Sequence, residues 1–279
     1  MYIKKASHYI PATKLDNELF SKTLDTSDEW IIKRTGIKSR YTASVESPER
    51  PIRSMAIKAV DKMGLSDSEK QKIKYIIFAS GLAEENYPNV GNYVAQHLNI
   101  KVPGIRVNSA CSSFVSGFKY AESLVGSGDV LVVSSEAFTS IGDYSDRSSC
   151  ILFGDGACAF LLSSQSTEYF VYATELEGFG TDLINTGHPG EKPKKTISEY
   201  CLENVSMTEE EREGIENLGL DNSYGNFRQD GPEVYRTIIT DIPKLLNSKI
   251  KRHINDKEKI FIIGHQANLR MLEKITKKI

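Results

Sequence analysis

The chain has 279 residues, of which 39% are hydrophobic and 26% are charged, and its net charge is −2. This length is enough for one large domain or two fused halves with a sizeable buried core. The slightly negative charge gives no reason to expect a nucleic-acid partner, and no apolar run approaches the ~20 residues that a membrane span needs. The N-terminus lacks the apolar stretch of a signal peptide, so we expect a cytoplasmic protein that does not bind membranes.

The first motif is a predicted helix that carries Trp30 and Arg34. Thr26 and Glu29 have the spacing of a capping box, and Gly36 is suited to end the helix. Trp30 and Arg34 are four residues apart, so they share a face. An aromatic ring beside a guanidinium can hold a nucleotide, although a core tryptophan covered by a surface arginine is the commoner reason for such a pair.

Predicted helices and strands then alternate between residues 50 and 162. Continuous apolar strands between helices predict an α/β sheet that is covered on both faces. We expect helices over 52–63, 89–98 and 112–126, and strands over 74–80, 104–108 and 129–135. Residues 150–164, CILFGDGACAFLLSS, predict two strands around a Gly-Asp-Gly turn, which resembles a phosphate loop only superficially.

Cys111 stands between the predicted strand 104–108 and the helix that follows. The positive end of a helix favours a thiolate and can bring a cysteine pKa from about 8.5 to between ~3.5 and ~7.5. The alternative is a small buried hydrophobe, which is what most free cysteines are. We assign no function to the other cysteines, which are Cys150, Cys158 and Cys201.

Residues 187–222 are polar and charged, and they interrupt the alternation. We predict a surface insertion there, with one short exposed helix. The alternation then returns, with a helix over 232–253, a strand over 259–263 and the start of a helix over 266–279. We therefore divide the chain into an N-terminal half, 1–170, that carries the cysteine candidate, and a C-terminal half, 171–279.

His265 follows the predicted strand 259–263 as Cys111 follows its own strand. IRVNSAC and IFIIGHQAN are the same construction, namely a buried strand, a turn of small residues and the start of a helix. This pattern predicts a duplicated α/β fold in which each half places one reactive residue at the C-terminal end of a strand. A histidine can exchange protons near neutral pH, although a lone histidine is more often structural. The sequence contains no metal-ligand spacing and no dinucleotide motif.

Five ordered motifs closely resemble the signatures of β-ketoacyl-acyl-carrier-protein synthase III. They are TSDEWIIKRTGIKSRY, NSACSSF, DRSSCILFGDGACAFLL, DGPEVY and GHQANLR. The resemblance implies a homodimer with a thiolase-like αβαβα fold, built from two duplicated halves of which the second is incomplete. It also implies an acyltransferase that moves an acyl group from acyl-CoA to Cys111. A decarboxylative Claisen condensation with malonyl-acyl carrier protein then gives a 3-oxoacyl product and initiates fatty acid synthesis, with no cofactor or metal beyond the CoA thioester substrate.

The same resemblance implies a role for each matching residue. Cys111 would be the nucleophile, and His265 would bind the malonyl thioester carbonyl and help decarboxylation. The remaining positions are Trp30 with Arg147 around the CoA adenine, Arg34 on CoA, Gly231, Tyr235 and Asn268 in the pantetheine channel, Tyr87 in the acyl pocket of the partner subunit, and Arg236, Arg270, Lys274, Lys277 and Lys278 as a basic patch for the acidic carrier protein.

The sequence also departs from the family pattern. The third catalytic residue of the family, an asparagine in a Gly-Asn-Thr-Ser segment, and a glycine-rich loop with an oxyanion-binding N–H have no counterpart before Ile279. Ser113 and Cys158 stand where glycine is usual. Losing one oxyanion donor typically costs ~10²–10³ in rate, so we expect this chain to condense poorly as it stands. Two alternatives stay open: a relative that uses Cys111 to make a specialised metabolite such as a quinolone, a resorcinol or an ester, and a non-catalytic subunit that binds acyl groups or the carrier protein.

Overall fold

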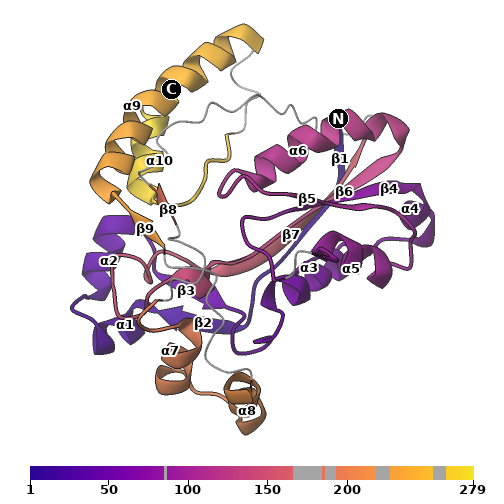
Figure 1. The fold of residues 1–279 in the computed structure, drawn as a ribbon. Coiled ribbons are helices and arrows are strands. Elements are labelled where there is room, and N and C mark those ends of the chain that lie inside the picture. Colours follow the sequence, from indigo (N-terminus) through magenta and orange to yellow (C-terminus); the bar gives the residue numbers. More distant parts are fainter. Residues whose placement is uncertain (85–86, 166–183, 186–192, 218–226, 254–261) are drawn as a thin grey trace.

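The frame of the molecule is a five-stranded sheet with the strand order β1-β7-β6-β4-β5 (Figure 1). The computed structural model describes residues 1–84, 87–165, 184–185, 193–217, 227–253 and 262–279. The strands are β1 (Tyr2–Tyr9), β4 (Ile73–Ala79), β5 (Gly104–Val107), β6 (Asp129–Ala137) and β7 (Asp155–Ser163). Strand β4 runs parallel to β5 and β6, whereas β7 is antiparallel to both of its neighbours.

Helices cover both faces of this sheet, as the continuous apolar strands predict. Along β4, Ile76 and Phe78 pack into one core while Ile77 and Ala79 pack into another, because alternate side chains of a strand point to opposite faces. Helices α3 (Pro51–Lys62) and α5 (Val90–His97) cover the first face, with the short α4 (Asp67–Lys72) at the edge, and α6 (Ser113–Leu124) covers the second (Figure 1).

Helix α6 packs very closely on β4. A Cβ atom built on Gly117 would lie only 2.8 Å from the Cβ of Ala79, so any larger residue would push the helix outward. The single-turn helices η1 (Val125–Ser127) and η2 (Phe138–Ile141) flank β6. The close packing at Gly117 therefore fixes the distance of the start of α6, and of the turn before it, from the sheet.

A second lobe lies beyond the strand ends of the sheet, where β7 begins, and has its own core (Figure 1). It contains β2 (Thr13–Asp16), β3 (Ser39–Thr42), α1 (Asn17–Thr23), α2 (Asp28–Thr35), α7 (Ile197–Asn204) and α8 (Glu209–Asn217). The prediction of a surface insertion is wrong for α7, because Tyr200 and Cys201 are 0% exposed and Tyr200 stacks on Phe20 at 5.4 Å between ring centroids. The acidic run Glu209–Glu211, which helped to suggest an exposed segment, lies in the first turn of α8.

The described C-terminal residues form two helices and a short ribbon. They are β8 (Ile184–Asn185) paired with β9 (Arg228–Gln229), α9 (Gly231–His253) and α10 (Leu269–Thr276), and α10 packs against α9. The strand predicted over 259–263 is not formed at its described end, since Ile262 and Ile263 have no strand pairing and Ile263 is 91% exposed. Residues 259–261 lie outside the described part of the chain.

The segment 150–164 also differs from its prediction. Its second half is strand β7, but residues 150–154 form a turn and not a strand. Among the described residues, no helix combines the length and apolar character needed to cross a bilayer. The same residues contain no group of three or more histidine, cysteine, aspartate or glutamate side chains arranged to hold a metal ion.

Candidate active site

Cys111 lies in the turn that joins β5 to α6, and its side chain is exposed. The turn bends at Ala110, whose φ of 48° lies in the left-handed region that non-glycine residues rarely adopt. The side chain of Asn108 supports this bend by accepting a hydrogen bond from the Ala110 N–H at 3.0 Å. The sheet therefore presents Cys111 at the C-terminal end of a parallel strand, where open α/β sheets place their reactive groups.

The hydroxyl of Ser113 holds the same turn from the helix side. It donates to the carbonyl of Ala110 at 2.6 Å and accepts a hydrogen bond from the N–H of Ser109 at 2.9 Å. Ser113 is buried, so both bonds are shielded from water. A glycine at this position would make neither bond, and the serine therefore gives this chain two additional restraints on its cysteine turn.

The surroundings of Cys111 raise the pKa of its thiol, which corrects the expectation of a thiolate. Loss of water around the sulfur is the larger cause, and the negative charge of Glu136 adds to it. One side of Cys111 is open to solvent, but protein atoms around the rest of the sulfur displace water. Helix α6 begins only at Ser113, and the field of a helix terminus acts mainly within its first turn.

The other three cysteines are packing residues. Burial raises the pKa of Cys150 and Cys201 to about 12 and that of Cys158 to about 11. Cys150 and Cys201 are fully buried in the core of the second lobe, and Cys158 lies in β7 opposite Ser134. Buried thiols of this kind are inert.

His265 lies in an irregular segment just before α10, and its side chain is exposed. Neighbouring protein atoms still remove enough water to lower the pKa of the imidazole, so the neutral ring predominates at neutral pH. The side chains of Cys111 and His265, both described in the structure, share no hydrogen bond. The histidine is therefore not a bonded base for the thiol in this conformation.

Trp30, Arg34 and Arg147 form one cation–aromatic cluster. The guanidinium carbon of Arg34 lies 5.5 Å from the Trp30 ring centroid, as the i, i+4 spacing predicts, and that of Arg147 lies 4.8 Å from it. The helix that carries Trp30 starts differently from the prediction: Ser27 is the N-cap, since its hydroxyl accepts from the Trp30 N–H at 3.1 Å. Thr26 does not cap the helix as predicted, because its hydroxyl has no hydrogen-bond partner in the described structure.

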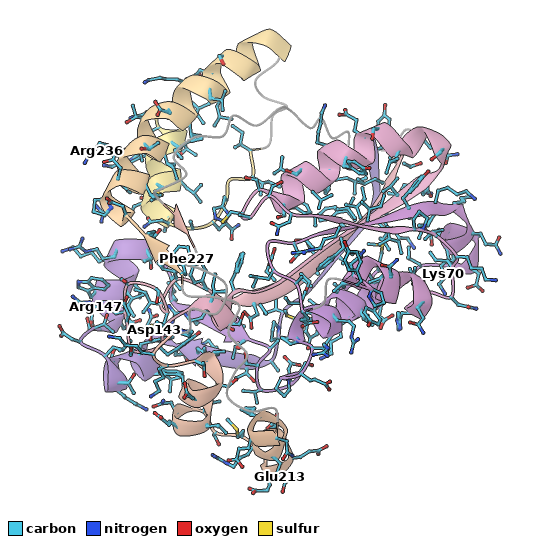
Figure 2. All side chains as sticks on the ribbon, viewed as in Figure 1. Lys70, Asp143, Arg147, Glu213, Phe227 and Arg236 are labelled. Atoms are coloured by element: carbon cyan, nitrogen blue, oxygen red, sulfur yellow. The ribbon has the colours of Figure 1, made fainter. Side chains whose placement is uncertain are left out.

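Asp143 and Arg147 lie close together in one loop (Figure 2), which is tied to a distant part of the chain. The buried carboxylate of Asp143 accepts hydrogen bonds from the N–H groups of Lys194 at 3.0 Å and Lys195 at 3.2 Å. Arg147 itself donates to the backbone carbonyl of Asp25 and pairs with the Asp25 carboxylate at 3.4 Å. The arginine is thus placed over the tryptophan by contacts on both sides of its loop.

Asn268 links the helix of the tryptophan cluster to the helix that follows His265. Its side chain accepts a hydrogen bond from the N–H of Arg270 at 3.0 Å, which caps α10, and donates to the carbonyl of Arg34 at 3.0 Å. Next to this link, a Cβ on Gly36 would lie 2.5 Å from the Cβ of Leu269, and the φ of Gly36 is 81°. The close approach and the left-handed backbone both require glycine at the end of α2.

The other two predicted channel residues lie in the first turns of α9. Gly231 is the first residue of the helix, and a Cβ there would meet no atom within 4 Å. The hydroxyl of Tyr235 is buried and has no partner in the described structure, and the Lys274 ammonium lies 5.2 Å from its ring centroid. An unpaired buried hydroxyl is free to bind a polar group of a ligand.

Tyr87 is the most exposed large aromatic side chain of the described residues, with 94% of its surface open to solvent. Its two preceding neighbours, 85 and 86, lie outside the described part of the chain. This exposure fits the prediction that Tyr87 inserts into a partner subunit, which stays a prediction.

The basic patch is only partly available for docking. Arg270, Lys274, Lys277 and Lys278 are all exposed, with Lys277 as the C-cap of α10 and Lys278 just beyond it, and their use as one docking surface stays a prediction. Lys278 donates to the carbonyl of Ile239 at 2.8 Å. Arg236 pairs with Glu233 at 2.9 Å on the outer side of α9 (Figure 2).

The sequence analysis missed Asp155 as a structural centre of the Gly-Asp-Gly turn. Its buried carboxylate accepts bonds from the backbone N–H groups of Ala43 and Thr139, both at 2.9 Å, and from the hydroxyls of Thr42 and Thr139. Complete burial raises the pKa of Asp155 to about 6. The sequence held one signal, since an aspartate between apolar residues needs several donors to be tolerated inside a protein.

Comparison with known proteins places the chain among condensing enzymes. A family model described as 3-oxoacyl-[acyl-carrier-protein (ACP)] synthase III matches residues 105–180, which include Cys111. Beta-ketoacyl-[acyl-carrier-protein] synthase III 2 of Halalkalibacterium halodurans is 31% identical over 97% of this chain and 76% of its own length. The protein with the same description from Staphylococcus epidermidis is 32% identical over 97% of this chain and 77% of its own length.

The solved structures agree with the sequence comparison. The crystal structure of 3-oxoacyl-[acyl-carrier-protein] synthase III from Aquifex aeolicus superposes with a TM-score of 0.72 at 25% sequence identity. The match covers 99% of this chain and 80% of that one. The predicted thiolase-like α/β fold is therefore confirmed.

Proposed function

Because this chain belongs to the 3-oxoacyl-[acyl-carrier-protein] synthase III family of acyltransferases, we propose that it condenses an acyl-CoA primer with malonyl-acyl carrier protein at Cys111, in the first step of fatty acid synthesis. The setting of Cys111 carries the proposal. It is the exposed cysteine of the four, and it stands at a strand end in a turn that two side chains hold in place. A packing cysteine would need neither exposure nor a strained turn.

The proposed reaction has two steps. In the first, the thiol of Cys111 loses its proton and attacks the thioester carbonyl, the carbon–sulfur bond to CoA breaks, and CoA leaves as the thiol. In the second, the malonyl group loses its carboxylate as CO₂, and the electron pair left on carbon attacks the acyl carbonyl. The bond to Cys111 then breaks, which gives the 3-oxoacyl thioester and the free cysteine. His265, which is neutral and exposed, would donate a hydrogen bond to the malonyl thioester carbonyl in this step.

Trp30 and Arg147 form the site at which we propose that the adenine of the CoA donor binds. An adenine stacked between the Trp30 ring and the Arg147 guanidinium needs about 7 Å between those two groups, which is twice a contact distance of ~3.5 Å. The guanidinium carbon of Arg147 lies only 4.8 Å from the Trp30 ring centroid. The arginine must therefore move outward to admit an adenine. Its ion pair with Asp25 is exposed, and pairs of this kind contribute little to stability.

The predicted partners fit the surface of the molecule. The exposed Tyr87 supports a homodimer in which each subunit completes the acyl pocket of the other. Arg270 and Lys277 are exposed cations of the basic patch whose side chains form no hydrogen bond or ion pair in the described structure, and they support docking of an acidic carrier protein.

One incubation tests the proposal. The protein is mixed with acetyl-CoA or octanoyl-CoA and then with malonyl-acyl carrier protein, and both the intact protein and the products are analysed by mass spectrometry. A 3-oxoacyl carrier protein with an acylated intermediate on Cys111 is the expected result, and Cys111→Ser is the control that should give neither. An acylated Cys111 with a different product would favour a specialised condensing enzyme, and carrier binding without acylation would favour a non-catalytic subunit.

A further inference from the structure

Glu136 is a partly buried carboxylate at the C-terminal end of β6, and no sequence motif pointed to it. Because β6 is parallel to β4, the end of β6 lies beside the turn that follows β4. The carboxylate accepts hydrogen bonds from the backbone N–H of Gly81 at 2.6 Å and from that of Leu82 at 3.3 Å. Bonds from N–H groups to a carboxylate are stronger than neutral ones, so Glu136 fixes this turn.

The turn at Gly81 contacts the turn that carries Cys111 and so supports it. The carbonyl of Gly81 accepts a hydrogen bond from the side chain of Asn108 at 3.3 Å, and a Cβ on Gly81 would lie 3.4 Å from the Cα of Ala110. Asn108 is the residue that accepts the Ala110 N–H at the strained bend. A continuous set of contacts across three strand ends therefore leads from Glu136 to Cys111.

Glu136 also brings a negative charge to the nucleophile. This charge raises the pKa of the Cys111 thiol, second only to loss of water. From the neighbouring strand β5, the positive charge of Arg106 acts in the opposite sense on Glu136, but burial has the larger effect and raises the pKa of the carboxyl to about 7. Asp155, the β7 residue opposite Ala137, is occupied by its own four donors.

We propose that Glu136 is a positioning residue that holds the Cys111 turn through Gly81 and Asn108, and that its carboxylate beside this turn lowers the reactivity of the sulfur toward small electrophiles. The two effects are separable. Positioning favours attack on a bound thioester, whereas the charge lowers the reactivity of the thiol toward any small electrophile. The inference gains its catalytic meaning from the proposed function, but it concerns contacts and thiol chemistry that can be measured without turnover.

The charge effect is tested by alkylation of Cys111 with iodoacetamide between about pH 6 and pH 9, located by peptide mass spectrometry. In the unmodified protein, the logarithm of the rate should rise with a slope below one around neutral pH, because ionisation of Glu136 makes the thiol harder to ionise. Glu136→Gln should restore a slope of one and raise the rate at about pH 7.5 several-fold. A decrease of half a pKa unit alone would raise the thiolate fraction about threefold.

Glu84→Gln is the matched control for this measurement. Glu84 lies in the same loop, also accepts backbone N–H groups, those of Ile52 at 2.5 Å and Arg53 at 3.1 Å, and its pKa is also raised to about 7, chiefly by burial. Its charge is not among the influences on Cys111. Glu84→Gln should therefore leave the alkylation profile unchanged, and a Glu136→Gln profile that matches it would overturn the charge effect.

The positioning effect is tested by hydrogen exchange at the Gly81 and Leu82 amides and in the Cys111 turn. Glu136→Ala should lose protection there while Glu136→Gln, which keeps an amide oxygen as acceptor, loses less. Unchanged protection in the folded Glu136→Ala protein would overturn positioning, whatever its acyltransferase activity. Should Cys111 prove not to be acylated in any variant, the proposed function fails, and the alkylation and exchange results still decide the present inference.

Discussion

The turn that carries Cys111 and the segment that carries His265 are built very differently. Asn108, Ser113 and, through Gly81, Glu136 hold the first, so it is restrained by three strand ends and a helix. The second has no strand before it in the described residues, and its fixed point is Asn268 at the start of α10. Cys111 is thus fixed at the end of a strand of the sheet, whereas the position of His265 depends on how one helix docks.

The two steps of the proposed reaction therefore place different demands on the chain. Acyl transfer needs the Cys111 sulfur at one fixed position, which the end of a strand in the sheet provides. The segment that carries His265 would accept the second substrate, and it is joined to α2, the proposed CoA-binding helix, because Asn268 bonds to the Arg34 carbonyl and Leu269 packs on Gly36. Occupancy of the proposed CoA site and the position of His265 would therefore be connected through Asn268.

The largest effect is expected at the rigid side of the comparison. Cys111→Ser should abolish the acyl adduct formed with acetyl-CoA or octanoyl-CoA, because a serine hydroxyl in this turn has no base bonded to it. Mass spectrometry of the treated protein measures the adduct, and the other cysteines should stay unmodified since their pKa values are about 11 to 12. An adduct on Cys150, Cys158 or Cys201 would refute the assignment.

His265→Ala should separate the two steps. We expect loss of 3-oxoacyl product with part of the acyl-enzyme retained, because His265 forms no hydrogen bond with Cys111 and the sheet positions the sulfur without it. Quenched time courses that follow the Cys111 adduct and the product separately give the measurement. Equal loss of both steps would show that the histidine acts on the thiol and that the two segments work as one unit.

Charge reversal of Arg270 and Lys277 together should weaken carrier-protein binding several-fold and make it less sensitive to salt. Acylation by free acyl-CoA should be nearly unchanged, because neither side chain bonds to Cys111 or belongs to the cluster of Trp30 with Arg34 and Arg147 in the described structure. Reversal of Arg236 is a useful control, since its pairing with Glu233 already offsets part of its charge. If affinity and salt dependence both persist in the double variant, these residues are ordinary solvated surface.

The smallest effect compares two asparagines with the same local bond. Asn108 and Asn268 each accept the N–H two residues ahead at 3.0 Å. Asn268→Ala should cost about 1 kcal/mol of local stability, as for loss of an N-cap, and raise hydrogen exchange in α10. Asn108→Ala should raise exchange less, because Ser113 still holds the Cys111 turn.

Asn268→Asp refines this comparison. Aspartate keeps the cap on α10 but cannot donate to the Arg34 carbonyl, so α10 should stay protected while its contact with α2 loosens. Equal exchange in α10 for Asn268→Ala and the unmodified protein would mean that packing of Leu269, and not the asparagine, holds the histidine segment.

Much of the sheet and its helices was predictable from the sequence. The helices over 52–63, 89–98 and 112–126 lie within one or two residues of α3, α5 and α6, because each has a clear apolar period and a clear stop signal. The motif order also identified the family. Two short apolar runs were wrongly predicted to be strands, because an apolar run forms a strand only beside a partner strand. Residues 150–154 and Ile262–Ile263 are apolar, yet they have no strand partner.

The sequence by itself determined the strand–turn–helix setting of Cys111, the shared face of Trp30 and Arg34, and the family. Only the tertiary structure decided what surrounds the sulfur, because Glu136, Gly81 and Asn108 come from three separate strand ends that meet only in the folded sheet. It likewise decided that α7 is a core helix and that Asp155 is a buried acceptor. Charge and burial act through space, so a pKa that the local pattern predicts to decrease can instead increase once distant residues displace the water.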